Sequence, residues 1–120
     1  MDARTEPTDI VLKHETRVLE IAFADGGHFS LPAEYLRVES PSAEVQGHTP
    51  SQRKLVAHKG RVGFAGAEPV GTYAIRLIFD DGHETGIYTW RYLRELGETQ
   101  ADRWAAYLAR LDAAGSSRGV

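Results

Sequence analysis

The chain has 120 residues, a net charge of −3 and no cysteine. This length suits one domain, and without cysteine the chain alone cannot form a disulfide, a thiolate zinc site or a cysteine-ligated iron–sulfur cluster. The acidic balance gives no electrostatic reason to expect a nucleic acid or an anionic membrane as partner. No apolar run approaches the roughly 20 residues that span a bilayer, and the polar N-terminus has no secretion signal, so we expect a cytoplasmic protein.

Composition divides the chain into one domain with short polar ends. Residues 1–8 are polar and are predicted to be flexible, and residues 9–114 are predicted to form a single domain. Residues 115–120, GSSRGV, are rich in glycine and serine and are predicted to be a flexible tail.

The first part of the domain has the pattern of strand, turn, strand and helix. A short strand is expected at 10–12, and residues 17–23 alternate with the period of a strand. Asp-Gly-Gly at 25–27 predicts a hairpin turn because glycine accepts a positive φ, and residues 28–31 return as a strand. The proline that begins residues 32–37 favours the start of a short helix. The strand side chains predicted to share one face are Leu19, Ile21 and Phe23.

A polar, turn-rich segment at 39–53 is predicted to be the longest irregular stretch of the chain. Loops of this length in small domains are often binding surfaces. Weaker apolar patterns at 55–57 and 61–64 predict two short strands after it.

The second part repeats the same order of elements. Residues 71–79 give the clearest strand pattern, and a turn at 81–82 leads to a returning strand at 86–88. A helix is predicted over 90–96, with Thr89 as its N-cap. The side chains predicted to share one face of the long strand are Tyr73, Ile75, Leu77 and Phe79.

Gly97 is predicted to end that helix, and Thr99 is predicted to cap the last helix, residues 100–114. The apolar residues of this last helix recur at helical spacing and predict a stripe facing the core. They are Trp104, Tyr107, Leu108 and Leu111.

Two segments share one order of residues: LEIAFADGGHFSLPAEYLR at 19–37 and IRLIFDDGHETGIYTWRYLR at 75–94. Each reads as a β-hairpin followed by a helix, either through duplication or because both hairpins obey the same turn chemistry. The predicted fold is therefore α+β, a two-layer sandwich of a mainly antiparallel sheet made by two β-hairpin–helix units, plus a C-terminal helix.

His83, directly after the Asp81–Gly82 turn, is the one residue that suggests a chemical site. A histidine after such a turn is more often a solvated side chain than a ligand or a base. No pair of histidines has the spacing of a helical zinc motif, and no nucleophile elbow or phosphate loop is present, so we predict no enzyme activity. The arginines and aromatic residues at 90–94 fit a helix packed on a sheet, so we predict no nucleic-acid partner.

Two stretches, LPAEYLRVESPSAEVQGH at 31–48 and EPVGTYAIRLIFDDGHETGIYTWRYLRELG at 68–97, carry a resemblance to a known family. The chain resembles the gamma-butyrobetaine hydroxylase-like N-terminal domain family, in its small stand-alone bacterial form, over roughly residues 10–112. In the carnitine-pathway dioxygenases this domain precedes an iron and 2-oxoglutarate domain, which this chain has no room for. A related domain also forms the C-terminal end of some P-loop iron–sulfur carrier proteins.

The resemblance also implies a structural zinc held by three cysteines and one histidine. The cysteine positions fall on Ser40, Ser42 and Val45, and the histidine position falls on His83. Serine is a poor replacement for a thiolate and valine cannot bind at all, so the family's zinc site is not expected. The same matching implies that the 39–48 loop lies beside the turn that carries His83.

These considerations predict a non-catalytic accessory domain that contacts another protein and has no resident cofactor. A P-loop iron–sulfur carrier is the candidate partner, and neither a membrane nor a nucleic acid is expected. The predicted contact surface comprises Ser40, Ser42, Glu44, Gln46, His48, Asp81, His83 and Glu84. The alternative is a metal-binding protein, with zinc as the candidate ion, in which His83 acts with His48 and Glu44 or with His28.

Overall fold

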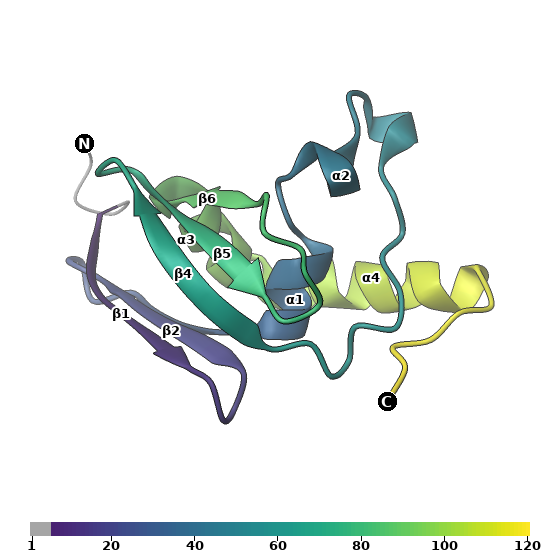
Figure 1. The fold of residues 1–120 in the computed structure, drawn as a ribbon, viewed down its shortest axis with the longest axis horizontal. Coiled ribbons are helices and arrows are strands. Elements are labelled where there is room, and N and C mark those ends of the chain that lie inside the picture. Colours follow the sequence, from purple (N-terminus) through teal and green to yellow (C-terminus); the bar gives the residue numbers. More distant parts are fainter. Residues whose placement is uncertain (1–5) are drawn as a thin grey trace.

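The computed structural model describes residues 6–120 (Figure 1). In this part of the chain two antiparallel sheets have the strand orders β1-β2-β3 and β4-β5-β6. The strands are β1 (Pro7–Lys13), β2 (Val18–Phe23), β3 (His28–Pro32), β4 (Phe64–Val70), β5 (Ala74–Phe79) and β6 (Ile87–Thr89). The helices are α1 (Ala33–Val38), α2 (Ala43–Gln46), the 3-10 helix η2 (Pro50–Gln52), α3 (Trp90–Glu98) and α4 (Gln100–Ala113).

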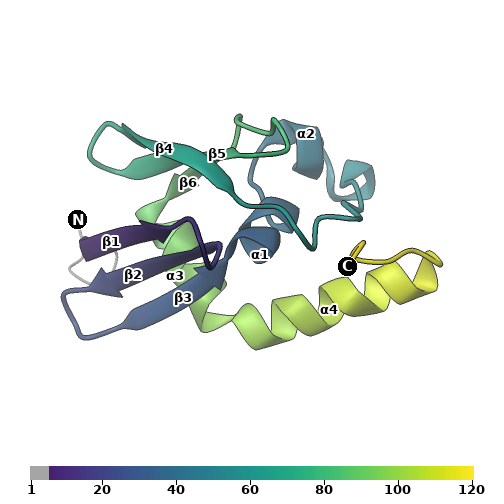
Figure 2. The same cartoon turned by 60° about the horizontal axis from the view of Figure 1, so that its bottom comes forward.

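The α+β sandwich prediction is confirmed, with two three-stranded sheets where one mainly antiparallel sheet was expected. Figure 2 shows the two sheets as separate layers, with α4 extending away from them. The alternating residues of β2 and β5 point inward as predicted, and with α1 and α3 they form one core. Tyr73 is the exception, because β5 begins only at Ala74 and leaves the Tyr73 side chain half exposed in the preceding turn.

The turns of the two sheets have the same backbone geometry. Gly26 has a φ of 92° and Gly82 a φ of 93°, a region that favours glycine. In each turn a phenylalanine N–H donates to the carbonyl four residues later, Phe23 to Gly27 and Phe79 to His83. His83 therefore lies inside its turn, in the place of Gly27, and its true counterpart is not His28.

The helices that follow the two sheets exchange matching hydrogen bonds. The Tyr35 hydroxyl on α1 donates to the Leu96 carbonyl on α3 at 2.7 Å. The Tyr92 hydroxyl on α3 donates to the Glu39 carbonyl after α1 at 2.5 Å. The residue correspondence that pairs Tyr35 with Tyr92 also pairs Glu39 with Leu96. Each unit therefore donates the same hydrogen bond to the corresponding position of the other.

The middle of the chain differs most from the sequence prediction. The segment 39–53 is not wholly irregular, because it contains α2 and η2. Residues 55–57 form no strand, and the strand expected at 61–64 begins only at Phe64 and continues to Val70 as β4. This strand lies at a sheet edge and is built of small residues and a proline, which have low strand propensity, so its pairing with β5 decides its structure.

The ends of the last helices also differ from expectation. The α3 helix continues through Gly97 to Glu98. The Thr99 side chain does not cap α4, since its hydroxyl donates back to the Glu95 carbonyl at 2.7 Å. Tyr107 and Leu111 of the predicted stripe are buried, but Leu108 is exposed.

The last residues, predicted as a flexible tail, return along the chain (Figure 2). The Ser117 carbonyl accepts the His58 N–H at 3.0 Å, and the Arg118 carbonyl accepts the Gly60 N–H at 2.7 Å. At the other end, Pro7 and Thr8 of the predicted flexible N-terminus already belong to β1. Residues 1–5 of that segment lie outside the described residues.

Candidate functional site

The loop after α1 lies against the turn between β5 and β6, as the family resemblance implies. The Ser40 hydroxyl lies 2.9 Å from Nε2 of His83, and the Ser42 hydroxyl lies 2.6 Å from the hydroxyl of Thr85. Ser42 also accepts the Glu44 N–H at 3.2 Å and so caps α2. Two segments far apart in the sequence are thereby fixed to each other.

Asp81 holds the turn in shape and attaches it to α1. One carboxylate oxygen accepts the His83 N–H at 3.1 Å, and the other lies 2.8 Å from Arg37 and 2.7 Å from Lys59. Burial alone would raise the pKa of Asp81, but the hydrogen bonds from Lys59, the His83 backbone and Arg37 lower it to about 2. Asp81 is therefore a carboxylate at neutral pH and a structural group of the turn.

His83 is buried, so the expectation of a solvated side chain is wrong. Its ring packs on Phe79 with 6.0 Å between centroids, and Nδ1 lies 3.1 Å from a carboxylate oxygen of Glu44. Burial, followed by the charge of Arg37, lowers the pKa of His83 below its usual value of 6.5. A neutral ring with these partners donates from Nδ1 to Glu44 and accepts at Nε2 from the Ser40 hydroxyl.

Ser40, His83 and Glu44 follow the order of a hydrolase triad, but Ser40 is 0% exposed. A Cβ built on Gly86 would lie 2.6 Å from the Ser40 oxygen, so the backbone of Gly86 closes over the hydroxyl. That oxygen also accepts the Ser42 N–H at 3.3 Å. Ser40 and His83 are the buried part of this hydrogen-bond network and Glu44 is its exposed end, so no substrate carbonyl can reach the serine.

The side chains proposed as metal ligands lie in different surroundings. His48 donates its backbone N–H to Gln52 and lines a cavity of about 470 Å³, whereas His28 lies on β3 beside Glu20 at 3.2 Å. Glu44 is the acidic side chain that reaches His83. From residue 6 onward no group of three or more His, Cys, Asp or Glu side chains could hold a metal ion.

The family's zinc ligands would likewise not be reproduced by the residues in their places. The hydroxyls of Ser40 and Ser42 are occupied by His83 and Thr85, and Val45 is a buried apolar side chain. The donor set is one imidazole with two hydroxyls, which does not fit zinc.

The predicted contact residues differ in exposure. The Asp81 side chain is 16% exposed and is paired with Arg37 and Lys59. Ser40, Ser42 and His83 are buried and fasten the loop to the turn. The exposed residues on the outer side of α2, η2 and the turn form what we call the loop–turn surface: Glu44, His48, Thr49, Glu84 and Thr85. Gln46 is partly buried and donates to the Ser40 carbonyl at 2.8 Å.

Sequence reasoning missed the ion pairs that anchor this loop. Glu39, buried at the end of α1, lies 2.9 Å from Arg53 and 3.3 Å from Arg103 of α4. Arg37 was missed too, although its match with Arg94 in the repeated Tyr-Leu-Arg was a usable signal. Glu39 and its arginines have no such signal, because their positions follow no short motif.

Comparison with known proteins agrees with this geometry. The model of the family described as gamma-butyrobetaine hydroxylase-like, N-terminal, matches residues 10–94. The chain therefore belongs to this family. No curated protein matches the chain significantly.

Three solved structures are similar over most of their length. Two NMR solution structures have 47% and 50% sequence identity and TM-scores of 0.81 and 0.80; each match covers 94% of this chain, and 89% and 84% of the other. A crystal structure from Acidithiobacillus ferrooxidans has 42% identity and a TM-score of 0.68, covering 81% of this chain and 98% of the other. It is described as a protein of unknown function in the DUF971 family.

The helices of residues 6–120 are all too short or too polar to cross a membrane.

Proposed function

We propose that the protein is a non-catalytic interaction module whose loop–turn surface contacts another protein. The observation that carries the proposal is the Ser40–His83 hydrogen bond, which fixes the α2 loop to the β5–β6 turn in one arrangement. A surface held in its binding shape before contact loses little conformational entropy on association. Both side chains are buried, with Ser40 0% exposed, which supports an interaction role over a catalytic one.

The charges of the loop–turn surface indicate which kind of partner it can bind. Glu44 and Glu84 are exposed carboxylates, and His48 and Thr49 add hydrogen-bonding groups beside them. A surface of this kind complements a partner that presents basic and polar side chains. The proposal includes a cytoplasmic location.

The proposed partner is a P-loop iron–sulfur carrier protein, and the proposed role lies in iron–sulfur protein maturation. The support for this partner is the family resemblance, since a related domain is fused to such carriers. In the fused proteins the linker raises the effective concentration of the domain at the carrier, and the separate domain proposed here binds the carrier without that gain.

The test is a titration of the ¹⁵N-labelled protein with a purified P-loop carrier from the same organism. We expect saturable shifts of the backbone amides of 43–49 and 84–85. Glu84→Arg should weaken binding about tenfold by placing a like charge against the partner. Asp102→Arg, the same charge change at an exposed site on α4, should leave binding unchanged.

The proposal of this partner is wrong if the carrier causes no saturable shifts, or if the shifts map away from the loop–turn surface. Equal binding by Glu84→Arg and the unaltered protein would show that the surface is not the contact.

A further inference from the structure

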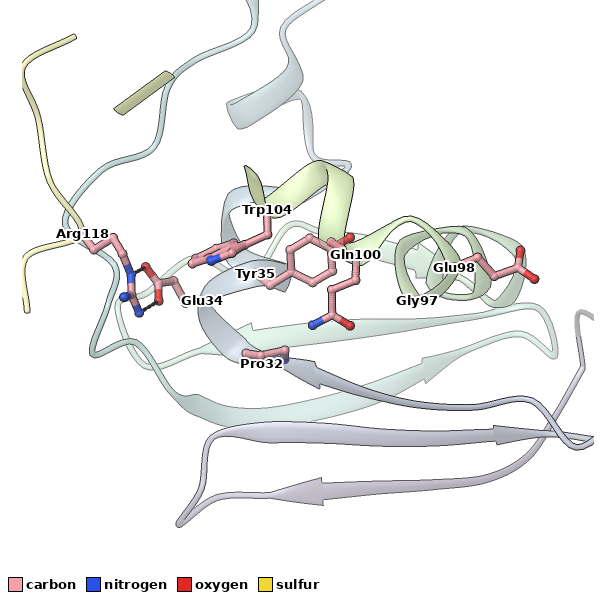
Figure 3. Close-up of a pocket in the computed structure, with 9 residues that line it drawn as sticks. Pro32, Glu34, Tyr35, Gly97, Glu98, Gln100, Trp104 and Arg118 are labelled. Carbon is pink, nitrogen blue, oxygen red and sulfur yellow. Dashed lines mark hydrogen bonds and ion pairs between the residues drawn. The ribbon is translucent and has the colours of Figure 1, made fainter. Parts of the chain in front are cut away.

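A cavity of about 690 Å³ lies between α1, the junction of α3 with α4, and the C-terminal residues (Figure 3). Its volume falls in the range of small-ligand and side-chain pockets. The residues that line it are Pro32, Glu34, Tyr35, Gly97, Glu98, Gln100, Ala101, Trp104 and Arg118. None of them belongs to the loop–turn surface.

One end of the cavity holds an ion pair between Glu34 and Arg118 (Figure 3). Nε and Nη2 of Arg118 donate to the two carboxylate oxygens of Glu34 at 2.8 and 2.6 Å. The Arg118 guanidinium also lies over the Trp104 ring, 5.4 Å from its centroid. A two-pronged bond to a carboxylate together with an aromatic face is the arrangement by which proteins recognise a guanidinium.

The two partners of this ion pair are held very differently. The Glu34 side chain belongs to α1 and is 8% exposed, whereas the Arg118 side chain is 41% exposed and comes from the Gly-Ser-Ser-Arg-Gly segment. The carboxylate and the indole belong to α1 and α4, and the guanidinium comes from a segment whose backbone is held separately, with the Arg118 carbonyl accepting the Gly60 N–H at 2.7 Å. Arg118 occupies the site in the manner of a tethered ligand.

The rest of the cavity also suits a cation with peptide groups around it. Without Arg118, the charged groups of the lining are the carboxylates of Glu34 and Glu98, of which Glu98 is paired with Arg94 at 3.1 Å, and no lining cation remains. Within residues 6–120 the side-chain N–H groups of Gln100 and Trp104 make no hydrogen bond. They can bind the carbonyl groups that flank a side chain in a peptide.

We infer that this cavity is a binding site for the arginine side chain of a partner peptide, and that Arg118 is its internal occupant. The incoming guanidinium takes the place of Arg118 on Glu34 and Trp104. Tethered occupancy weakens binding from outside, because apparent affinity falls by the fraction of time that the site is free. A site filled nine-tenths of the time by Arg118 binds an external ligand about tenfold more weakly.

The test uses N-acetyl-argininamide as the probe and follows the indole N–H resonance of Trp104 by NMR. Trp90→Phe, introduced in every variant, leaves Trp104 as the single indole. Arg118→Ala should bind the probe about tenfold more tightly than the chain with Arg118. N-acetyl-glutaminamide should not bind, and methylguanidine, which lacks the peptide groups, should bind more weakly than the arginine probe.

Two further variants locate the binding. In the Arg118→Ala background, Glu34→Gln should abolish binding of the probe because it removes the carboxylate. Ala101→Phe should also abolish it by filling the cavity from an exposed position, whereas Ala105→Phe, exposed on the same helix but outside the lining, should not. The Ala101 and Ala105 pair decides the question even if Glu34→Gln does not fold.

Several results would overturn the inference. The first is a folded Arg118→Ala protein that shows no saturable shift with the arginine probe, or that binds this probe no more tightly than the chain with Arg118 does. The second is a glutamine probe or methylguanidine that binds as tightly as the arginine probe, and the third is an Ala101→Phe variant that binds the arginine probe unchanged. Because the cavity and the loop–turn surface share no residue, each of these results leaves the carrier-binding proposal to its own test.

Discussion

Arg94 of α3 binds Asp25 in the turn of the other unit through two bonds, each 2.9 Å long. The hydrogen bond from Arg94 is the main cause that lowers the pKa of Asp25 to about 2. Arg37 of α1 makes the reciprocal contact with Asp81 at 2.8 Å. The Arg94 side chain is largely covered, with its guanidinium 5.0 Å from the ring centroid of Phe23.

The tyrosine hydrogen bonds between α1 and α3 are reciprocal in the same way. Their contribution to stability can be tested by substitutions that remove only the hydroxyl oxygen. Tyr35→Phe and Tyr92→Phe should each lower the free energy of unfolding by about 1–2 kcal/mol, since each leaves a carbonyl without its donor. Urea denaturation measures the loss. Tyr73→Phe, at a half-exposed hydroxyl, should stay within about 0.5 kcal/mol of the unaltered protein. If Tyr35→Phe lowers the free energy of unfolding no more than Tyr73→Phe does, the hydrogen bond of Tyr35 does not stabilise the fold.

The lowered pKa of His83 predicts a pH dependence of stability. The unfolded chain binds a proton at this residue with the usual pKa of 6.5, whereas the folded protein binds it only at lower pH. The contribution is therefore fully present above pH 6.5 and is lost as the pH falls below that value. Urea midpoints measured between pH 7.5 and 5.0 should fall for the unaltered protein.

The His83→Gln variant should flatten this part of the pH profile, because it removes the titrating group. His48→Gln, at an exposed histidine, should keep the slope of the unaltered protein. An unchanged slope in His83→Gln would assign the pH dependence to another residue.

Gly97 is required for packing and not for ending its helix. A Cβ at this position would lie 2.4 Å from the ring of Phe29 on β3. Gly97→Ala should therefore destabilise the protein by about 1–3 kcal/mol, even though alanine favours a helix. Calorimetric melting measures the change, and Phe29→Leu in the same chain should restore part of it. A rise in melting temperature with Gly97→Ala would show that the Phe29 ring moves aside at little cost.

The positions of the missing zinc ligands make a prediction about metal binding. A variant with Ser40→Cys, Ser42→Cys and Val45→Cys should bind one zinc ion, because the first two positions already adjoin His83 or its neighbour Thr85. Elemental analysis of untagged protein gives the stoichiometry, and a chelator should lower the melting temperature of the variant alone. Stoichiometric zinc in the unaltered protein would instead support the metal-binding alternative.

Short sequence patterns correctly predicted the elements whose structure depends on neighbouring residues in the chain. The alternation in β2 and β5, the two Asp-Gly turns and the Thr89 cap, whose hydroxyl accepts the Tyr92 N–H at 3.0 Å, all lie within short windows of sequence. Most of β4 was missed because its register comes from the neighbouring strand. The predicted Thr99 cap was wrong because the Thr99 hydroxyl donates to the Glu95 carbonyl of the preceding helix.

The candidate site depended on long-range contacts and was only partly accessible from sequence. The family resemblance placed the loop beside His83, since Ser40 and His83 lie 43 residues apart and no periodicity relates them. The burial of His83 and the bond from Arg118 to Glu34, 84 residues apart, could not be predicted, because each depends on how finished elements pack.

The exchange of tyrosine and arginine contacts between the two halves has a consequence for folding. Neither half can reach its final structure while the other is unformed, since each keeps the hydrogen-bond acceptors that the other's helix needs. Loss of one hairpin would release the opposite helix, so amides in both halves should exchange with solvent at one common rate-limiting opening. Cleavage of the chain between the halves should therefore yield fragments that refold only when mixed.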